Sequence, residues 1–598
     1  MYDVCNCQLS IVNCQLNMFP TSIKEMTALG WDYVDVVVFT GDAFIDHPAF
    51  GAAVIARILE AEGLRVAVVP QPNWRDDLRD FRKFGEPRMF FSVSAGAMDS
   101  MVNHYTAAKR LRSDDAYSVE GKAGFRPDRA TDVYCSILKK LYPCTPVVIG
   151  GIEASQRRFT HYDYWDNKLR ESILVTSGAD LLVYGMGEKQ MQTLVRRLKK
   201  GESFSTIKDI PQTAYLGDIQ SVDIELAPHE KCLESRRAEA QNFKIFETES
   251  NKYAPTAVLG QRVGDKMVIC NPAYPPLTTA ELDYIYDLPY TRQPHPRYKG
   301  KRIPAFDMIR YSITMHRGCF GGCSFCTISA HQGKYIASRS KESILREVRQ
   351  IVSDPDFKGY ISDLGGPSAN MYCLTGKNLD ICKKCVKPSC LHPKICPNMN
   401  TDHSKLIELY RAVRGVAGIK KATIGSGIRY DLATPQYIEE VMRYHVSGRL
   451  KVAPEHTSSI VLNLMRKPDF SNFIRFDSLF NEINRKYGLR EQLIPYFISS
   501  HPGCTDADMA EMAAITKSLN FHLEQVQDFT PTPLTLSTEM YYTGLNPYTL
   551  EPVKCARTPE QKKSQRSFFF WYKPEEKRGI IQKLKEIGRS DLINKIYK

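Results

Sequence analysis

The chain has 598 residues, of which 43% are hydrophobic and 25% are charged, the ordinary balance of a folded globular protein. A single hydrophobic core stops growing at about 250–300 residues, so this length predicts two or three domains. No stretch approaches the roughly 20 apolar residues of a membrane helix, and the first residues lack the pattern of a signal peptide. We therefore expect a cytoplasmic protein without membrane contact. The net charge of +13 leaves an anionic partner such as RNA open.

The first 17 residues contain a short duplication, because residues 6–9 and 13–16 both read NCQL. We expect this segment to be either a disordered tail or upstream sequence that precedes a true start at Met18. Cys5, Cys7 and Cys14 are therefore not expected to join a metal site.

Residues 18–300 alternate between strand and helix patterns. Residues 32–41 and 65–72 are β-branched runs that predict strands, and residues 48–64 between them have helical apolar spacing. Such a βαβ unit predicts a parallel sheet. Residues 145–155 and 179–189 predict two more strands, whereas 190–300 is irregular. The predicted fold class is α/β, with a Rossmann-like N-terminal domain and a linker over 18–300.

A regular strand–helix rhythm begins near residue 311. Strands are predicted at 312–317, 359–366, 420–429, 448–456, 493–503 and 522–531, with helices at 340–353, 403–414, 435–445, 471–487 and 505–519. Ser340 is the expected N-cap of the first helix. Six repeats predict a partial (β/α)6 barrel over 301–531, with its site at the carboxyl ends of the strands. Polar candidates at those ends are Ser426, Arg429, Glu455, His456, Ser500, His501, Gln525 and Asp528.

Eight of the seventeen cysteines lie between residues 319 and 396. In a long chain without a secreted context, clustered thiols indicate metal ligands. Cys319, Cys323 and Cys326 form C-x3-C-x2-C with interleaved glycines, just after the first barrel strand. Three thiolates in one loop can hold three corners of an iron–sulfur cubane and leave the fourth iron open. The alternative is a zinc knuckle or free thiols, but structural zinc requires four closed ligands.

This C-x3-C-x-aromatic-C motif, with Phe325 as the aromatic residue, resembles the signature of radical S-adenosylmethionine (SAM) enzymes. The resemblance implies a 4Fe-4S cluster on the three cysteines, with SAM chelated to the open iron. It further implies reductive cleavage of SAM to methionine and a 5′-deoxyadenosyl radical, with Phe325 beside the adenine. Gly365 and Gly366 resemble the segment whose carbonyl groups meet the SAM amino group, although Pro367 replaces the usual acidic residue. Arg429 is a candidate partner of the SAM carboxylate.

A second cysteine group, Cys382, Cys385, Cys390 and Cys396, lies in an insert at 371–400, with Cys373 upstream as a spare. The insert has few apolar residues, so we expect a cross-link to order it, and four thiolates on a metal would provide one. Zinc and an auxiliary iron–sulfur cluster both suit four cysteines, and unligated thiols are a third alternative. We favour a second cluster because the insert follows a strand end at the rim of the predicted site.

The whole arrangement resembles one family. An N-terminal α/β region precedes the motifs DLGGPSANMY, ICPNMNTDH, APEHT, PYFISSHPG and MYYTGLNP, a combination that resembles the YgiQ family of radical SAM proteins from about Met18 onward. The resemblance implies cluster and SAM binding and supplies no substrate. The N-terminal region also resembles cobalamin-binding domains that show D-x-H-x-x-G. Because His47 directly follows Asp46 here, we predict no histidine-ligated cobalamin, and base-off binding without a histidine stays open.

The leading prediction is an enzyme with radical SAM catalytic activity on an unknown substrate, reduced by a donor such as flavodoxin or ferredoxin. One alternative is a methylthiotransferase-like modifier of RNA or protein, and another is an iron–sulfur redox or sensor protein without substrate turnover. Residues 551–598 hold thirteen Lys or Arg and six Asp or Glu, within a basic C-terminal extension at 532–598. We expect this extension to dock on the barrel rather than bind RNA, because Phe568, Phe569, Phe570 and Trp571 are contiguous and apolar.

Overall fold

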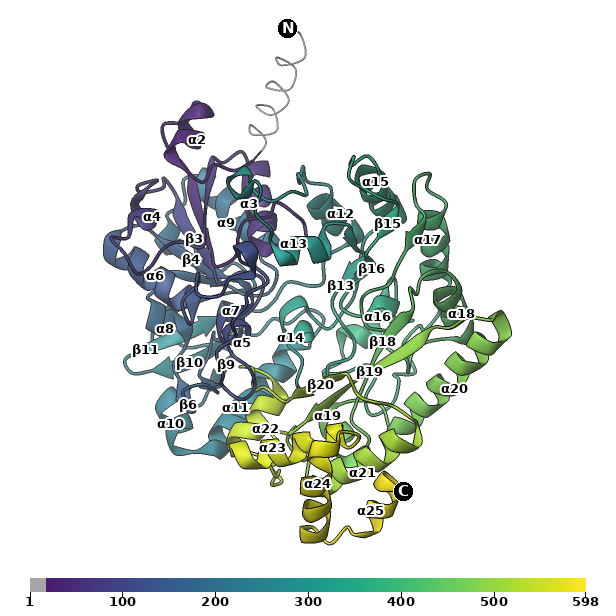
Figure 1. The fold of residues 1–598 in the computed structure, drawn as a ribbon. Helices are drawn as coiled ribbons and strands as arrows, with labels where there is room; N and C mark the ends of the chain where they lie inside the picture. Colours follow the sequence, from purple (N-terminus) through teal and green to yellow (C-terminus); the bar gives the residue numbers. More distant parts are fainter. Residues whose placement is uncertain (1–17) are drawn as a thin grey trace. The chain divides into compact units, whose positions relative to one another are not determined.

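The computed structural model describes residues 18–598, in two compact units (Figure 1). The first unit holds residues up to 233 together with 254–310, and the second holds 234–253 together with 311–598. The NCQL duplication and Cys5, Cys7 and Cys14 lie outside the described residues. Residues 234–253 fall within the predicted N-terminal domain, whereas the structure places this segment in the second unit.

A nine-stranded sheet forms the centre of the first unit, with the order β2-β1-β3-β4-β7-β8-β11-β10-β9. The parallel half consists of β1 (Val36–Thr40), β2 (Val66–Pro70), β3 (Phe90–Ser94), β4 (Val147–Gly150) and β7 (Leu181–Val183). The mainly antiparallel half consists of β8 (Thr213–Asp218), β9 (Ile224–Leu226), β10 (Leu259–Val263) and β11 (Lys266–Cys270). The unit is therefore a mixed α/β fold with a large parallel-dominated sheet.

The predicted βαβ unit is present in the first unit. Every residue of β1 and β2 is buried, as expected for parallel strands with both faces covered. Helix α3 (Gly51–Ala61) connects them and buries Val54, Ile58 and Leu59. Strand β3 lies between β1 and β4 and was not predicted, because two serines interrupt its apolar run. The strands β8 to β11 were likewise missed in a region that we considered irregular.

Short helices and one hairpin complete the first unit. The hairpin is β5 (His161–Asp163) with β6 (Lys168–Arg170). The helices are α2 (Ile23–Ala28), α4 (Arg79–Arg82), α5 (Ser100–His104), α6 (Ala130–Leu141), α7 (Gly151–Gln156), α8 (Ile173–Ser177), α9 (Glu188–Lys199), α10 (His229–Glu234), α12 (Thr279–Tyr286) and α13 (Pro304–Ile309). Helices α6 and α7 pack on β3 and β4, so the loops that leave these two strands are held close together.

The second unit contains parallel strands that pair in chain order. β12 (Ser312–Thr314) pairs with β16 (Asp363–Gly365), β15 (Tyr360–Ile361) pairs with β17 (Lys421–Ala422), and Ile428 bridges to Val452. β18 (Arg449–Glu455), β19 (Gln492–Ser499) and β20 (Gln525–Asp528) form a three-stranded parallel sheet. Five of the six predicted strands coincide with these segments to within about four residues, whereas the strand predicted at 420–429 is limited to β17, with Ile428 in an isolated bridge. The partial barrel itself stays a prediction.

The five predicted helices of the second unit are present as α15 (Lys341–Val352), α17 (Ser404–Arg414), α18 (Pro435–Tyr444), α20 (Phe470–Tyr487) and α21 (Asp506–Ser518). Ser340 caps α15, since its Oγ accepts the Ser343 N–H at 3.0 Å. Ile344, Val348 and Ile351 form the buried face of α15. Further elements here are β13 (His316–Arg317), β14 (Ala337–Ser338), α14 (Ile328–Gln332), α16 (Leu379–Lys383), α19 (Ser459–Met465), α11 (Arg236–Ser250) and α22 (Leu536–Thr543).

The basic C-terminal extension packs on the core of the second unit. Its helices are α23 (Pro559–Ser567), α24 (Pro574–Glu586) and α25 (Asp591–Tyr597). Phe568 and Phe569 are each 1% exposed, and the Trp571 Nε1–H donates to Thr516 Oγ1 at 3.2 Å. The expected docking of this aromatic segment is therefore confirmed.

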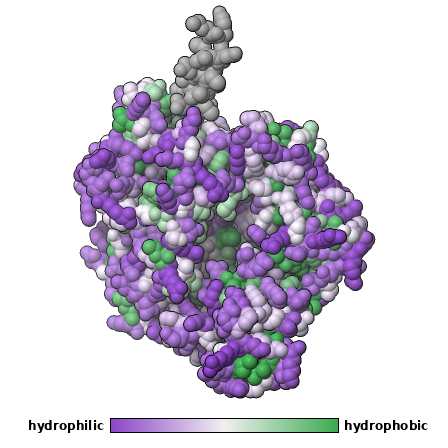
Figure 2. All heavy atoms as spheres, in the orientation of Figure 1, coloured by the Kyte–Doolittle hydropathy of each residue, from purple (hydrophilic) through white to green (hydrophobic). Residues whose placement is uncertain are grey.

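The surface of the molecule is mainly hydrophilic on the face shown in Figure 2, with apolar residues in small scattered groups. Within residues 18–598, no helix has both the length and the apolar character needed to cross a membrane.

Candidate functional site

The three cysteines of the C-x3-C-x2-C motif lie in the loop between β13 and α14. A Cβ at Gly318 would lie 2.2 Å from the Tyr335 carbonyl oxygen, and a Cβ at Gly322 would lie 2.3 Å from that of Pro388. Both glycines also have positive φ, +87° and +57°. Only glycine permits this backbone path without a shift of its neighbours. The interleaved glycines therefore let the loop pack tightly against two other segments.

Two of the three cysteine sulfurs accept hydrogen bonds. The Gly321 N–H donates to Cys319 Sγ at 3.4 Å, and Arg429 Nη1 donates to Cys323 Sγ at 3.6 Å. Arg429 is held in place by Asp431, which accepts from Nε at 2.8 Å and from Nη2 at 2.7 Å. Such donors stabilise thiolates over thiols. In this structure Arg429 contacts a cysteine of the motif, while its predicted contact with a SAM carboxylate stays a prediction.

Burial raises the pKa of two cysteine thiols in this loop. Burial, with the neighbouring Cys323, raises the pKa of Cys319 and raises that of Cys326 to about 12. These two thiols would stay protonated near neutral pH in the absence of a cation. Because metals bind thiolates, binding here must displace protons, as expected for a site completed by its metal.

Charged and strained residues at the carboxyl ends of β18 and β19 lie around the loop. Glu455 ends β18 and lies 3.7 Å from Lys467 Nζ, with both residues less than a tenth exposed. Burial raises the pKa of the Glu455 carboxyl. Glu455 has φ of +68° and Ser500, just after β19, has φ of +60°. Left-handed backbone is uncommon outside glycine and is concentrated at functional sites.

A buried serine–histidine group fixes the middle of the cysteine loop. The Ser324 N–H donates to the Met465 carbonyl at 3.0 Å, and Ser324 Oγ lies 2.7 Å from Ser537 Oγ. His501 Nε2 lies 2.6 Å from the same Ser537 hydroxyl. Burial lowers the pKa of His501 to about 3, so the imidazole is neutral. The loop is thus anchored from α22 and from the end of β19.

The aromatic residue of the motif packs beside this group. The Phe325 ring meets His501 edge-on, with 6.1 Å between ring centroids. A small pocket behind the loop is lined by Cys323, Cys326, Phe246 and Leu536 among others. Phe325 is only partly buried, so its ring could still meet an adenine, as the resemblance implies.

The glycine pair at the end of β16 lies next to the first strand of the unit. The Gly365 carbonyl accepts the Met315 N–H at 2.8 Å. Side chains crowd both glycines, since a Cβ at Gly365 would lie 2.4 Å from Ser426 Oγ and one at Gly366 would lie 2.4 Å from the His316 ring. The Gly365 carbonyl is already used in the hydrogen bond with Met315 that pairs the two strands. Of the two glycines, Gly366 therefore has the freer carbonyl for a ligand.

The second cysteine group lies in the insert that follows this glycine pair. Cys382, Cys385, Cys390 and Cys396 are all partly exposed. The Cys385 N–H donates to the Cys382 carbonyl at 3.1 Å, and the Cys396 N–H donates to the Cys390 carbonyl at 2.8 Å. Burial raises the pKa of Cys390 to about 11, and Cys382, Cys385 and Cys396 are near enough to contribute. The four thiols are thus gathered in one region.

In the part of the chain that the structure describes, no three His, Cys, Asp or Glu side chains lie close enough to hold a single metal ion. A 4Fe-4S cubane is held by cysteines on different irons, so its ligands need not converge on one point. The loop around Cys319, Cys323 and Cys326 fits such a group. It supplies three thiols, hydrogen-bond donors to two of the sulfurs and a backbone path that needs glycine.

The loop at the position of the D-x-H-x-x-G motif, which it does not match, is buried in the first unit. His47 is 1% exposed, and its Nδ1 accepts the Ala49 N–H at 3.1 Å. Burial holds the pKa of His47 well below its ordinary value. Asp46 pairs with Arg57, and the Asp46 Oδ1 accepts the Arg57 Nε–H at 3.1 Å. Both residues of the loop are therefore engaged in packing and pairing.

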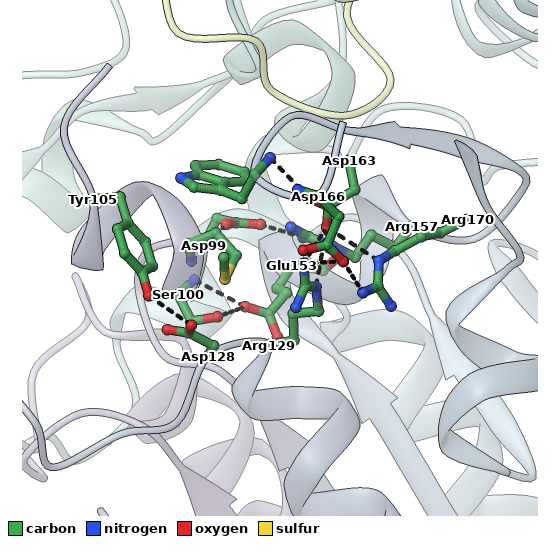
Figure 3. Close-up of polar contacts among 12 residues, drawn as sticks. Asp99, Ser100, Tyr105, Asp128, Arg129, Glu153, Arg157, Asp163, Asp166 and Arg170 are labelled. Atoms are coloured by element: carbon green, nitrogen blue, oxygen red, sulfur yellow. Dashed lines mark hydrogen bonds and ion pairs between the residues drawn. The ribbon is translucent and has the colours of Figure 1, made fainter. Parts of the chain in front are cut away.

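A polar network joins the segments that follow β3 and β4 in the first unit (Figure 3). Arg157 pairs with Asp99, and each side chain is 3% exposed. Glu153 accepts the backbone N–H groups of Ser100 and Thr131, each at 2.8 Å. These contacts neutralise buried charge and fix the strand-end loops to one another.

The same network continues through the β5–β6 hairpin. Arg129 Nη2 lies 2.9 Å from both Asp163 Oδ2 and Asp166 Oδ2, and Arg170 also pairs with both carboxylates (Figure 3). Two arginines thus form ion pairs with two aspartates, and these ion pairs stabilise the hairpin.

Sequence reasoning missed several residues that contact the site. Asp431 follows Arg429 by two positions at a strand end, and that R-x-D spacing was a usable signal. Lys467 and Ser537 come from distant segments, and Lys334 lies shortly after the cysteine loop but contacts Cys385 of the insert, so no local pattern reveals these contacts. Their contribution depends on tertiary packing.

Parallel strands, a three-cysteine loop at their carboxyl ends and a cysteine-rich insert define the chain as a radical SAM protein. Three family models match successive parts of it: "Radical SAM N-terminal" at 18–312, "Radical SAM superfamily" at 313–515 and "Domain of unknown function (DUF3362)" at 524–596. The class is that of radical SAM enzymes, whose members bind a 4Fe-4S cluster and SAM.

The chain belongs to the UPF0313 family, the YgiQ family that its motifs indicated. A UPF0313 protein of Bacteroides thetaiotaomicron is 59% identical, covering 97% of this chain and 98% of that protein. A UPF0313 protein of Porphyromonas gingivalis is 59% identical, covering 97% of this chain and 94% of that protein. A UPF0313 protein of Methanocella arvoryzae is 50% identical, covering 95% of this chain and 95% of that protein. The predicted family is confirmed.

Among solved structures, the radical SAM methyltransferase TsrM from Kitasatospora setae, with cobalamin and a 4Fe-4S cluster bound, aligns with a TM-score of 0.49 at 14% identity. The alignment covers 84% of this chain and 77% of that one. The cobalamin-dependent enzyme OxsB aligns with a TM-score of 0.47 at 11% identity, covering 87% of this chain and 56% of that one. Their cobalamin is a property of those proteins.

Proposed function

We propose that this protein cleaves SAM reductively at a 4Fe-4S cluster held by Cys319, Cys323 and Cys326, and that the resulting 5′-deoxyadenosyl radical acts on a substrate still to be identified. The observation that carries the proposal is the cysteine loop itself, whose sulfurs accept hydrogen bonds from Gly321 and Arg429. When bound, the cluster supplies the electron that breaks the carbon–sulfur bond of SAM.

The side chains around the loop have distinct roles in this proposal. Arg429 stabilises the Cys323 thiolate, and Asp431 holds the Arg429 guanidinium in the required orientation. Ser324 and Ser537 keep the loop backbone in place. Phe325 and Gly366 are the proposed SAM contacts, for the adenine and the amino group.

The polar groups nearest the cysteines are the proposed binders of the rest of SAM and of the substrate. Lys467 is a cation beside the loop; its ion-pair partner Glu455 is 3.7 Å away, and the Asp431 carboxylate is also near it. It is therefore better placed than the fully paired Arg429 to meet a carboxylate of SAM.

The metal at Cys382, Cys385, Cys390 and Cys396 is part of the proposal. We propose that these cysteines hold a metal centre, because both an iron–sulfur cluster and zinc are bound by four thiolates. A flavodoxin or ferredoxin is the proposed electron donor to the protein.

The two alternative functions, a methylthiotransferase-like modifier and a redox or sensor protein, require different features of the structure. A methylthiotransferase-like modifier of RNA would need a surface for bases, yet Phe568, Phe569 and Trp571 are buried in the core of the second unit. A redox or sensor protein would bind the cluster without cleaving SAM. The buried aromatic segment counts against a modifier of RNA, and the SAM-type loop counts against a redox or sensor protein that does not cleave SAM.

The test is anaerobic reconstitution, reduction with dithionite in the presence of SAM, and measurement of 5′-deoxyadenosine. We expect product from the wild type and none from Cys326→Ala, whose cluster absorbance should also be lost. Cys555→Ala is a matched control, since Cys555 is a half-buried thiol outside both cysteine groups. A fully loaded wild type that forms no 5′-deoxyadenosine would contradict the proposal and support the sensor alternative.

The substrate requires a second experiment. Fractions of cell extract are added to the reduced enzyme with SAM, and the formation of 5′-deoxyadenosine is followed. A fraction that raises the rate above the uncoupled level contains the substrate, whose class then separates nucleic acid from protein and small molecules.

A further inference from the structure

The insert is fastened directly to the first cysteine loop. The Cys390 N–H donates to the Phe320 carbonyl at 3.1 Å, and Ser389 Oγ donates to the Gly321 carbonyl at 2.6 Å. At the next residue, Gly322 approaches Pro388 so closely that a Cβ would lie 2.3 Å from its carbonyl oxygen. Residues 388–390 therefore run along residues 320–322, and a ligand from each cysteine group lies next to this contact.

The two cysteine groups also share one small hydrophobic core. Its buried members are Phe320 from the loop, Met371, Leu374, Leu391 and Met399 from the insert, and Leu432, which follows Arg429 in the chain. Cys319 from the first group and Cys390 and Cys396 from the second pack against this core. The insert is thus built around the first loop rather than standing apart from it.

A buried cation faces the second cysteine group. Lys334 is 2% exposed, and its ammonium donates to the Lys387 carbonyl at 2.6 Å and to Cys385 Sγ at 3.8 Å. Within the described residues no carboxylate lies within ion-pair distance of Lys334. A buried ammonium is costly unless negative charge compensates it. Thiolates on a metal centre carry that charge, and Asn398 Nδ2 donates to another of them, Cys382 Sγ, at 3.4 Å.

The outer surface of the insert is basic and partly apolar. Five exposed lysines lie in residues 371–400, against a single acidic residue, Asp380. The lysines are Lys377, Lys383, Lys384, Lys387 and Lys394. Ile381 and Val386, next to the cysteines, are 55% and 51% exposed. A positive surface with apolar side chains beside a metal centre is complementary to an acidic electron-carrier protein.

We propose that Cys382, Cys385, Cys390 and Cys396 hold a second iron–sulfur cluster rather than zinc, and that an acidic one-electron carrier protein docks on the lysines of the insert to reduce it. In this step the carrier is oxidised by one electron, the cluster is reduced by one electron, and no covalent bond forms. The contact between residues 388–390 and 320–322 favours a redox centre over zinc, because zinc has no redox chemistry. The inference rests on the proposed function only in requiring a first cluster that needs electrons.

The metal is identified in a variant without the first group, Cys319→Ala/Cys323→Ala/Cys326→Ala, purified and reconstituted anaerobically. We expect about four iron and four sulfide per chain and a spectrum that changes on reduction. A variant in which all seven cysteines of the two groups are replaced by alanine gives the background metal content. Stoichiometric zinc, or no metal, in the variant without the first cysteine group would overturn the proposal. Iron retained there together with a wild type that cleaves no SAM would instead count against the proposed function alone.

Lys334→Met tests the cluster without removing a ligand. Loss of a buried positive charge beside the sulfurs should move the midpoint potential of the second cluster to a more negative value. The potential is measured in the variant that lacks the first cysteine group, so that only the second cluster contributes. Lys358→Met is the matched control, since Lys358 is exposed just before β15, at the opposite end of the strands from the cysteine loop. An unchanged potential in Lys334→Met would contradict the assigned position of the cluster.

The docking surface is tested with a reduced acidic flavodoxin as the probe. Lys384→Glu/Lys387→Glu/Lys394→Glu should slow reduction of the protein by flavodoxin at least tenfold at low salt and leave reduction by dithionite unchanged. The matched control is Lys563→Glu/Arg578→Glu/Lys585→Glu, three exposed residues of the C-terminal extension. Equal rates with flavodoxin for both triple variants would refute docking at the insert.

Discussion

Gly318→Ala tests whether the cysteine loop depends on a close backbone contact. Gly318 has φ of +87°, and a Cβ there would lie 2.2 Å from the Tyr335 carbonyl oxygen. Gly448 is the matched control because its φ of +90° is similar, yet a Cβ there meets nothing within 4 Å and the residue does not contact the cysteine loop. Backbone strain of about 1–3 kcal/mol is common to both alanine variants. Overpacking adds about 1–3 kcal/mol in Gly318→Ala alone.

A kcal/mol of stability corresponds to about 2–4 °C in Tm for a domain of moderate size, so the two variants should differ by roughly 2–12 °C. Scanning calorimetry of the metal-free protein measures this difference, and iron analysis after reconstitution measures the effect on the site. We expect the lower Tm and the lower iron content in Gly318→Ala. If both variants melt together and bind equal iron, the contact with Tyr335 does not constrain the loop.

Three other variants test separate parts of the second unit. Arg429→Leu leaves the buried Asp431 without its arginine partner and should lower the free energy of unfolding by about 3–5 kcal/mol in a denaturant titration. The double variant Arg429→Leu/Asp431→Leu should recover most of that stability but should still bind less iron than the wild type. Equal iron content in the wild type and the double variant would contradict the role of Arg429. Burial, with the nearby Glu239, holds the pKa of Glu539 well above its ordinary value, so its contribution to stability is present at low pH and is lost as pH rises through the raised pKa. Glu539→Gln should therefore show a flatter dependence of Tm on pH between about 5 and 8, and parallel curves would refute this. Phe569→Ala should cost about 3–5 kcal/mol, and a loss below about 1 kcal/mol would contradict docking of the extension.

Much of the fold was predictable where the sequence carries a local signal. Val36–Thr40 and Val66–Pro70 are runs of β-branched and apolar residues, and both are buried parallel strands. Ser340 marked the start of α15 because its hydroxyl caps the helix. Strand β3, by contrast, reads FFSVS, and its place between β1 and β4 is decided by packing in the sheet rather than by its own composition.

The candidate site divides in the same way. The C-x3-C-x2-C loop was predictable because its ligands are neighbours in the sequence. The hydrogen bond from Arg429 to Cys323 joins residues that are 106 positions apart, and the bond between Ser324 and Ser537 spans 213 positions. The ammonium of Lys334 near Cys385 likewise depends on how the insert folds back. No pattern in a single sequence encodes such pairs.

The hydrogen bonds from Ser389 and Cys390 to residues 320–321 have a thermodynamic consequence for metal loading. Ordering either segment reduces the conformational entropy that the other still has to lose. A metal centre in the insert would therefore raise the affinity of the first loop for its cluster, and linkage requires the reverse effect to be equally large. During stepwise loading with iron, singly filled chains should be rarer than two independent sites would allow.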